Sequence, residues 1–213
     1  MIKKFILSRL LWLSILFPKF IFGLDDFESW SSIGFEKNLP HSFSLSFKQG
    51  LRLKEQLSVF KQTLSELSIS YKLLDNLKIE IPYRYIIYKN KTKHRVSLSA
   101  SHKYKMMSFY FKHRIKYQRT YEKKEYLEGL IRNKMYVYYK LKKKLEPFIS
   151  SEFFHFYEQG QYQFDELRLA FGFNIDLSKK QSLKVSYTLK SKDLTEEDSD
   201  QINIFLISYS FRL

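Results

Sequence analysis

Cysteine is absent from this chain of 213 residues. Its absence excludes a disulfide framework and thiolate metal sites. The five histidines are scattered along the chain, and no histidine or carboxylate pair stands at metal-ligand spacing on one predicted strand. We therefore expect no metal and no cofactor.

Catalytic motifs are also missing. A hydrolase of this kind would need a Ser or Asp with a His within hydrogen-bond reach. None of the five histidines stands in a recognisable motif of this kind. We expect no catalytic residue, and the chain is not predicted to be an enzyme.

Long apolar runs are confined to the N-terminus. Residues 1–23 have a basic start, an apolar run over residues 10–17 and a small residue, Gly23, at the end. This is the order of a secretory signal peptide. The segment is short and interrupted for a membrane-spanning helix. We predict a signal peptide over 1–23, and the alternative is an uncleaved N-terminal anchor.

Acidic residues are in the minority, with 22 Asp and Glu against 37 Lys and Arg and a formal net charge of +15. Such a balance indicates nucleic acid, acidic membrane surfaces or anionic ligands as partners. Because an exported protein does not meet the genome, we expect no nucleic-acid partner. Membrane lipids are the expected partner, and the sequence does not define an oligomeric state.

Alternation of apolar and polar residues is what the chain has in abundance. In the segment SFSLSFKQGLRLK at 42–54, Phe43, Leu45 and Phe47 alternate with Ser and Lys. On a strand this period of two places one set on each face of the sheet. Similar windows recur to the C-terminus and give about eleven candidate strands, most of roughly ten residues or more, the length that a membrane-spanning strand needs. No linker interrupts residues 24–213, which we interpret as one domain.

Two all-β architectures compete for this pattern. A soluble sandwich buries its apolar faces between two sheets and has short strands. A transmembrane barrel turns the apolar face toward lipid and the charged face toward the lumen, and its closure leaves no sheet edge. Long strands with charged polar faces favour an all-β, antiparallel transmembrane β-barrel of about 10–12 strands in the bacterial outer membrane. An even strand number, periplasmic termini and alternating short and long connections are expected. The alternative is a secreted soluble β-sheet protein that binds an anionic or hydrophobic ligand.

The last strand has the features of an assembly signal. The segment FLISYSFRL places one apolar face up to the final residue: Phe205, Ile207, Tyr209, Phe211 and Leu213. Bacterial outer-membrane barrels end in an alternating aromatic strand similar to this one, which implies the outer-membrane barrel assembly machinery as a partner. Their final residue is usually Phe or Trp, whereas this chain ends in Leu213.

Two neighbouring segments carry a family resemblance. One strand contains Pro147, Glu152 and Phe154 in a Pro-x-x-x-x-Glu-x-Phe pattern, and the next contains Arg168 and Gly172 in an Arg-x-x-x-Gly pattern. Together with Trp30, Arg52 and the segment RIKYQ at 114–118, this pattern resembles an uncharacterised family of bacterial outer-membrane β-barrels, a domain of unknown function (DUF2490). The resemblance implies a fold and a location, and it implies no activity.

The polar faces of the predicted strands form a lumen-facing charge ladder. We expect its members inside the barrel: Lys48, Arg52, Lys78, Glu80, Arg84, Arg95, Lys112, Arg114, Arg132, Lys134, Glu152, Glu166, Arg168, Asp176 and Lys184. Charges in a small lumen must be paired or hydrated. A structural ladder that fills the barrel is one interpretation. Because basic residues outnumber acidic ones, a narrow anion-favouring solute passage is the other.

Overall fold

The computed structural model describes residues 26–123, 125–141, 144–158, 161–194 and 200–213, and it contains one closed β-barrel. The alternation of side chains explains why these segments form strands. An extended strand turns its apolar side chains to one face and its polar side chains to the other. The strands are β1 (Asp26–Asn38), β2 (Phe43–Lys54), β3 (Val59–Leu74), β4 (Leu77–Ile87), β5 (Thr92–Met106), β6 (Phe109–Glu122), β7 (Glu125–Tyr139), β8 (Leu145–Glu158), β9 (Gln161–Asp176), β10 (Gln181–Ser191) and β11 (Gln201–Arg212). Among these described residues no helix is long and apolar enough to cross a membrane.

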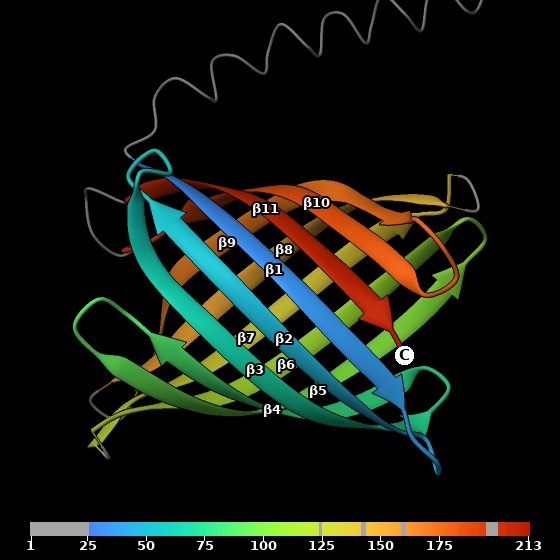
Figure 1. The fold of residues 1–213 in the computed structure, drawn as a ribbon, viewed down its shortest axis with the longest axis horizontal. Coiled ribbons are helices and arrows are strands. Elements are labelled where there is room, and N and C mark those ends of the chain that lie inside the picture. Colours follow the sequence, from blue (N-terminus) through green and yellow to red (C-terminus); the bar gives the residue numbers. More distant parts are fainter. Residues whose placement is uncertain (1–25, 124, 142–143, 159–160, 195–199) are drawn as a thin grey trace, which may run out of the picture.

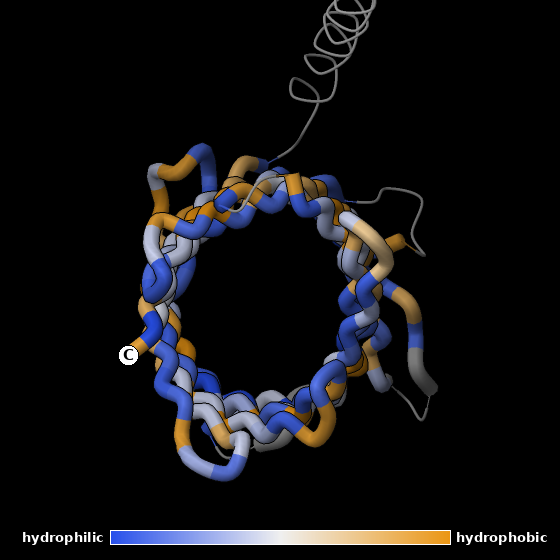
Figure 2. The backbone as a smooth tube through the Cα atoms, turned by 90° about the vertical axis from the view of Figure 1, so that its right-hand side faces the viewer, coloured by the Kyte–Doolittle hydropathy of each residue, from blue (hydrophilic) through white to orange (hydrophobic). Residues whose placement is uncertain are grey.

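Each strand pairs with its neighbours in sequence order, in antiparallel fashion, and β1 closes the ring against β11 (Figures 1 and 2). The closing pair is parallel and continuous from Asp26, opposite Ile202, to Glu36, opposite Arg212. The predicted all-β barrel of 10–12 strands is therefore confirmed, with one parallel pair in an otherwise antiparallel sheet.

The described residues form a barrel of eleven strands, so the expectation of an even number was wrong. With an odd number the first and last strands run in the same direction, which is why β1 and β11 are parallel. The described chain then starts at one end of the barrel and finishes at the other (Figure 1). We call these the N-end, where β1 starts at Asp26, and the C-end, where β11 finishes at Arg212. The expectation that both termini share one side does not hold for the described residues.

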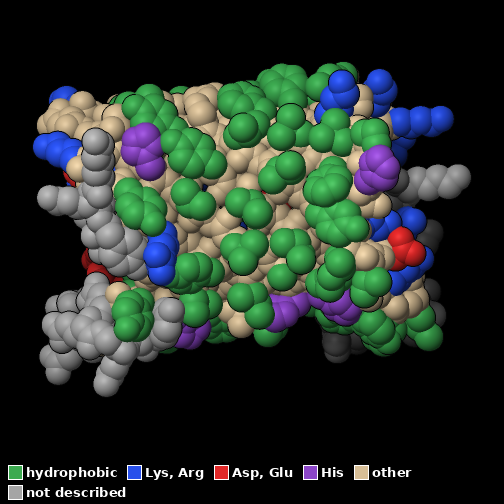
Figure 3. Space-filling view, turned by 90° about the horizontal axis from the view of Figure 1, so that it is seen from below, with side chains coloured by type: hydrophobic (Ala, Val, Ile, Leu, Met, Phe, Trp, Pro, Cys, Tyr) green, Lys and Arg blue, Asp and Glu red, His purple; other side chains and the backbone are tan. Residues whose placement is uncertain are grey.

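The outer surface of the barrel is apolar. Large hydrophobic side chains stay exposed along the middle of the strands, for example Ile69 at 46%, Leu98 at 53% and Ile149 at 61%. Apolar side chains cover the face shown in Figure 3, where Lys and Arg gather mainly at the two ends. The buried side chains are largely polar or charged, such as Gln118, Thr120 and Glu152. The described residues thus lack the apolar core between two sheets that the soluble alternative requires.

The connections differ less in length than the sequence predicted. The N-end connections are residues 55–58, 88–91, 123–124, 159–160 and 192–200, and those of the C-end are 39–42, 75–76, 107–108, 140–144 and 177–180. Strands extend into some of the charged segments that separate the apolar stretches: β7 begins at Glu125 and β9 at Gln161. Backbone pairing extends these strands beyond the apolar stretch, so one long connection remains, 192–200.

The C-terminal strand shows the predicted alternation. Phe205 and Ile207 are exposed on the outer surface, and Phe211 packs edge-on against Phe35 of β1 at a ring-centroid distance of 6.5 Å. The backbone N–H of Leu213 donates a hydrogen bond to the carbonyl of Glu36 at 2.8 Å. The last residue is therefore fixed to β1 even though its side chain is exposed. The predicted signal peptide, residues 1–23, lies outside the described residues.

Candidate functional site

The charged faces of the strands enclose two main cavities in the lumen. The larger part of the charge surrounds a cavity of about 450 Å³ that reaches from the barrel middle toward the N-end, and we call it the cationic cavity. A second cavity of about 630 Å³, the C-end cavity, lies on the other side of Lys48, whose side chain lines both. Drug-sized ligand sites in proteins have comparable volumes, about 300–1,000 Å³.

The structure places every residue of the sequence-predicted ladder against the lumen. The cationic cavity is lined by eleven of them: Lys48, Arg52, Arg84, Arg95, Arg114, Arg132, Lys134, Glu152, Glu166, Arg168 and Lys184. Glu80, Lys112 and Asp176 line the C-end cavity, and Lys78 lines a neighbouring cavity of about 510 Å³ at the C-end mouth.

Further residues of the same lining were missed from the sequence. The cationic cavity also contains Trp30, Lys61, Lys190 and Lys192, and Glu66 lines the C-end cavity. Trp30, Glu66 and Lys190 share the parity of the inward residues on their own strands, so an unbroken count of alternation could have found them. Lys61 has the opposite parity, because the register shifts where Arg52 pairs with Gln62 and Leu53 with Phe60.

Strand register arranges the lumen charges in two cross-strand rows. The first row runs across β6 to β10 through Arg114, Lys134, Glu152, Arg168 and Lys190. Directly opposite residues on neighbouring strands share a face, so the members of a row are neighbours in the lumen. In each of the two rows one carboxylate lies between basic residues. The second row runs across β2 to β5 through Lys48, Glu66, Arg84 and Arg95.

Glu152 is the centre of the first row. Its side chain is 2% exposed and contacts Arg132 at 2.6 Å, Arg114 at 3.1 Å and Lys134 at 3.1 Å. Arg132 also lies 4.6 Å from the ring centroid of Phe154. One carboxylate thus holds three cations against the β6–β8 wall and leaves an excess of positive charge there.

The other lumen carboxylates are also engaged. Glu66 binds Arg84 through Nε at 2.7 Å and through Nη2 at 2.5 Å. Glu166 forms ion pairs with Arg168 and, at 3.6 Å, with Lys190. Glu28 pairs with Lys61 and accepts a hydrogen bond from Trp30 Nε1 at 2.8 Å. The acids near the cationic cavity are consequently neutralised by cations already in the wall.

Several lumen cations have no carboxylate partner among the residues that the structure describes. Lys48, Arg52 and Lys184 form no ion pair within this part of the chain. Lys184 lies 4.3 Å from the ring centroid of Phe148, and Arg52 lies 3.7 Å from that of Trp30. Aromatic faces stabilise these cations without neutralising them, so their charge remains available to the cavity.

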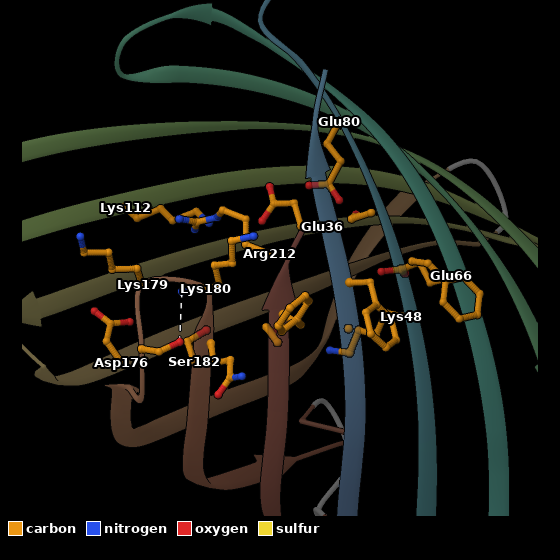
Figure 4. Close-up of a pocket in the computed structure, with 18 residues that line it drawn as sticks. Glu36, Lys48, Glu66, Glu80, Lys112, Asp176, Lys179, Lys180, Ser182 and Arg212 are labelled. Atoms are coloured by element: carbon orange, nitrogen blue, oxygen red, sulfur yellow. Dashed lines mark hydrogen bonds between the residues drawn. The ribbon is translucent and has the colours of Figure 1, made fainter. Parts of the chain in front are cut away.

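The C-end cavity has a more balanced lining. Its basic residues face a similar number of carboxylates, as Figure 4 shows for Lys112, Lys180 and Arg212 with Glu36 and Glu80. The positive excess is therefore concentrated in the cationic cavity, and the electrostatic potential differs between the two halves of the lumen.

An aromatic cluster forms part of the lumen wall, and two of its members, Tyr136 and Phe148, line the cationic cavity. Tyr110 stacks on Tyr138 with a centroid distance of 4.3 Å, and Tyr136 and Phe148 pack against Tyr138 at 5.4 and 5.6 Å. Tyr110 donates a hydrogen bond to Glu146 at 2.8 Å. This buried cluster braces β6, β7 and β8 and holds the lysines beside it in place.

Two histidines form hydrogen bonds with neighbouring side chains. His94 bonds the hydroxyl of Tyr83 at 2.7 Å, and His113 bonds the amide oxygen of Asn133 at 2.6 Å. Within the described ranges no group of three His, Asp or Glu side chains could hold a metal ion.

Comparisons with known proteins identify the chain by family and fold. A solved structure described as the NanC porin matches with a TM-score of 0.55 and 12% identity, over 88% of this chain and 99% of the porin. An OmpT of Vibrio cholerae from the outer membrane matches with a TM-score of 0.41 and 10% identity, over 72% of this chain and 53% of that one. No curated protein matches the chain. The family described as "Protein of unknown function (DUF2490)" matches residues 27–201, and the chain belongs to this family.

Proposed function

We propose that this barrel is an outer-membrane protein that forms a narrow, anion-favouring passage for small solutes. One observation carries the proposal: among the described residues, twelve Lys and Arg side chains line the cationic cavity, against two carboxylates. Rings of basic residues favour anions in pores, because they replace part of the hydration that the ion loses on entry.

The apolar exterior supports the membrane location. Exposed Leu, Ile and Phe side chains around the whole barrel would be unfavourable in water and suit the hydrocarbon of a bilayer. The fold similarity to the NanC porin points the same way. Membrane lipids are the partners that this surface requires, and the exposed face of β11 fits recognition by the barrel assembly machinery.

A structural role is the second candidate, and the Glu152 network favours it. Three cations fixed by one carboxylate narrow the lumen on the β6–β8 side, as the side chains of small barrels commonly do. In that case the ladder would stabilise the wall and no solute would pass. The two cavities that meet at Lys48 support the passage instead.

Planar-bilayer recording of the purified barrel in a KCl gradient tests the proposal. We expect discrete conductance steps and a reversal potential that shows chloride permeating faster than potassium. Lys184→Glu should shift this potential toward potassium, since it reverses a cavity charge that has no carboxylate partner in the described chain. Lys89→Glu, the same change in the 88–91 connection, should leave it nearly unchanged. A silent or cation-selective barrel would refute the passage.

A further inference from the structure

Trp30 gathers two guanidinium groups in the lumen. Arg52, its direct neighbour on β2, lies 3.7 Å from the indole centroid. Arg168 reaches the same indole from β9, on the other side of the closing pair, with a distance of 5.3 Å. Two like charges from opposite sides of the barrel seam are thus held against one aromatic ring.

Both guanidinium groups have donors to spare. Within the described residues Arg52 forms no hydrogen bond or ion pair with another side chain, and its one partner is the indole face. Arg168 forms an ion pair with Glu166 through one terminal nitrogen, whereas its Nε is buried and has no hydrogen-bond partner in the described chain. A buried guanidinium donor without an acceptor is costly. Arg52 and Arg168 both line the cationic cavity, so their other N–H groups can donate to an oxyanion there.

The surrounding charge sets the valence of that anion. Arg84 and Arg95 lie close enough to repel Arg52, and so does Arg168. The nearest carboxylates are already bound, Glu28 by Lys61 and Glu166 by Arg168 and Lys190. A single negative charge would leave most of this repulsion in place. An anion with two or more charges relieves more of it, and guanidinium forks bind its oxygens in pairs.

We propose that Trp30, Arg52 and Arg168 form a binding site for oxyanions that carry at least two negative charges. The indole contacts both guanidinium groups, and the ring centroid of Phe154 lies 4.3 Å from the guanidinium group of Arg168. Both groups are therefore held before the anion arrives, so less side-chain entropy is lost on binding. The site rests on the proposed passage only in that the anion must reach the cationic cavity, whose lining extends to Tyr88 and Lys192 at the N-end. Binding does not require that the anion leave at the other side.

Trp30 itself reports on the site. The chain contains two tryptophans, and Trp12→Phe leaves Trp30 as the only one. In the folded protein carrying this change, fluorescence is titrated with sulfate and with citrate, each at constant ionic strength maintained with sodium chloride. We expect a saturable change with both anions and none when chloride alone is varied.

Substitution of Arg52 distinguishes binding of sulfate at this site from general attraction to the positive charge of the lumen. Arg52→Gln should raise the half-saturating sulfate concentration about tenfold or more, since it removes a charge-assisted pair. Arg52→Lys keeps the charge but loses the forked guanidinium. Its half-saturating sulfate concentration should lie between those of the unchanged protein and Arg52→Gln. Lys78→Gln removes one charge from the C-end mouth and should leave sulfate binding within about twofold, because direct contacts dominate over distant screened charges. Folding of each variant is checked by heat-modifiable gel migration.

Three results would overturn the site: no saturable change with either anion, an equal response to chloride, or an equal weakening by Arg52→Gln and Lys78→Gln. Conductance gives a separate answer. A barrel that binds sulfate but passes no current keeps this site and refutes the passage, whereas a barrel that conducts chloride without saturable sulfate binding keeps the passage and refutes the site.

Discussion

The carboxylate of Glu152 accepts two hydrogen bonds from Arg132, one from Nε at 3.0 Å and one from Nη2 at 2.6 Å. Arg114 and Lys134 approach the same carboxylate, so Glu152→Gln leaves three cations without their common partner. We expect a loss of about 3 kcal/mol in the free energy of unfolding, the lower end of the range for a broken buried ion pair, because lumen water solvates the arginines in part. Urea unfolding of the barrel in lipid vesicles measures this loss.

Glu80→Gln is the matched control for that substitution. It removes the same charge from the C-end cavity, and the structure shows no ion pair of Glu80 among the described residues. We expect a change below about 1 kcal/mol, as for charges in high dielectric. If both variants unfold at the same urea concentration, the Glu152 network does not stabilise the wall.

Gly172 on β9 pairs with Ser186 on β10, and the two backbones approach each other closely there. A Cβ added there would meet the carbonyl oxygen of Val185 at 2.3 Å and the Cβ of Ser186 at 2.6 Å, and backbone cannot yield as a flexible side chain can. Gly172→Ala should destabilise the barrel by about 1–3 kcal/mol or prevent folding. A Cβ added at Gly34 would lie 3.7 Å from its nearest neighbouring atoms, so Gly34→Ala should fold normally. Folding yield on gels compares the two, and equal yields would contradict the close approach.

If the apolar outer surface faces lipid, the effect of a charged substitution depends on its depth along the barrel. Leu98 is exposed near the middle of β5, and Leu57 is exposed in the 55–58 connection. Leu98→Arg should lower the free energy of unfolding in vesicles by about 2–4 kcal/mol, whereas Leu57→Arg should change it by about 0–1 kcal/mol. Equal effects of the two substitutions would mean that the middle of the barrel does not face hydrocarbon.

The orientation of the barrel can be tested in intact bacteria. The longest connection, residues 192–200, lies at the N-end, and the C-terminus lies at the opposite end. Because outer-membrane barrels have short periplasmic turns and longer outer loops, we expect the N-end to face outward. An epitope inserted after Asn90 should bind antibody on intact cells, and one inserted after Asn76 should bind only after permeabilisation. The reverse pattern would invert the orientation.

Strand faces were predictable from the sequence, because a period of two fixes the face of each side chain. The alternation around Leu45 and Lys48 is reproduced. Arg95 also lines the lumen, although inward residues on the adjacent strands, such as Arg84 and Arg114, are even-numbered. A β-bulge adds a residue to one strand, so the alternation cannot be counted across it. At Lys61 the register shift reverses the parity, and the side chain reaches Glu28 in the lumen.

Closure and pairing were not predictable in the same way. Whether the ends of a sheet meet depends on strand tilt and stagger over the whole ring, so the parallel contact of Trp30 with Leu206 has no local sequence signal. The partners of Glu152 follow from the register of three strands. Arg168 reaches Trp30 across the closing pair, and that approach depends on the ring as a whole.

The central claim is that apolar residues face lipid while basic residues face an aqueous lumen. Phe47 and Lys48 are adjacent on β2 and point to opposite sides, and the absence of cysteine allows a single nitroxide label at each. Electron paramagnetic resonance of labelled Phe47→Cys and Lys48→Cys barrels in vesicles measures collisions with oxygen, which concentrates in lipid, and with a water-soluble nickel chelate. We expect a label at 47 to respond mainly to oxygen and a label at 48 to respond mainly to the chelate. The opposite responses would place the apolar face inside the barrel and refute this orientation.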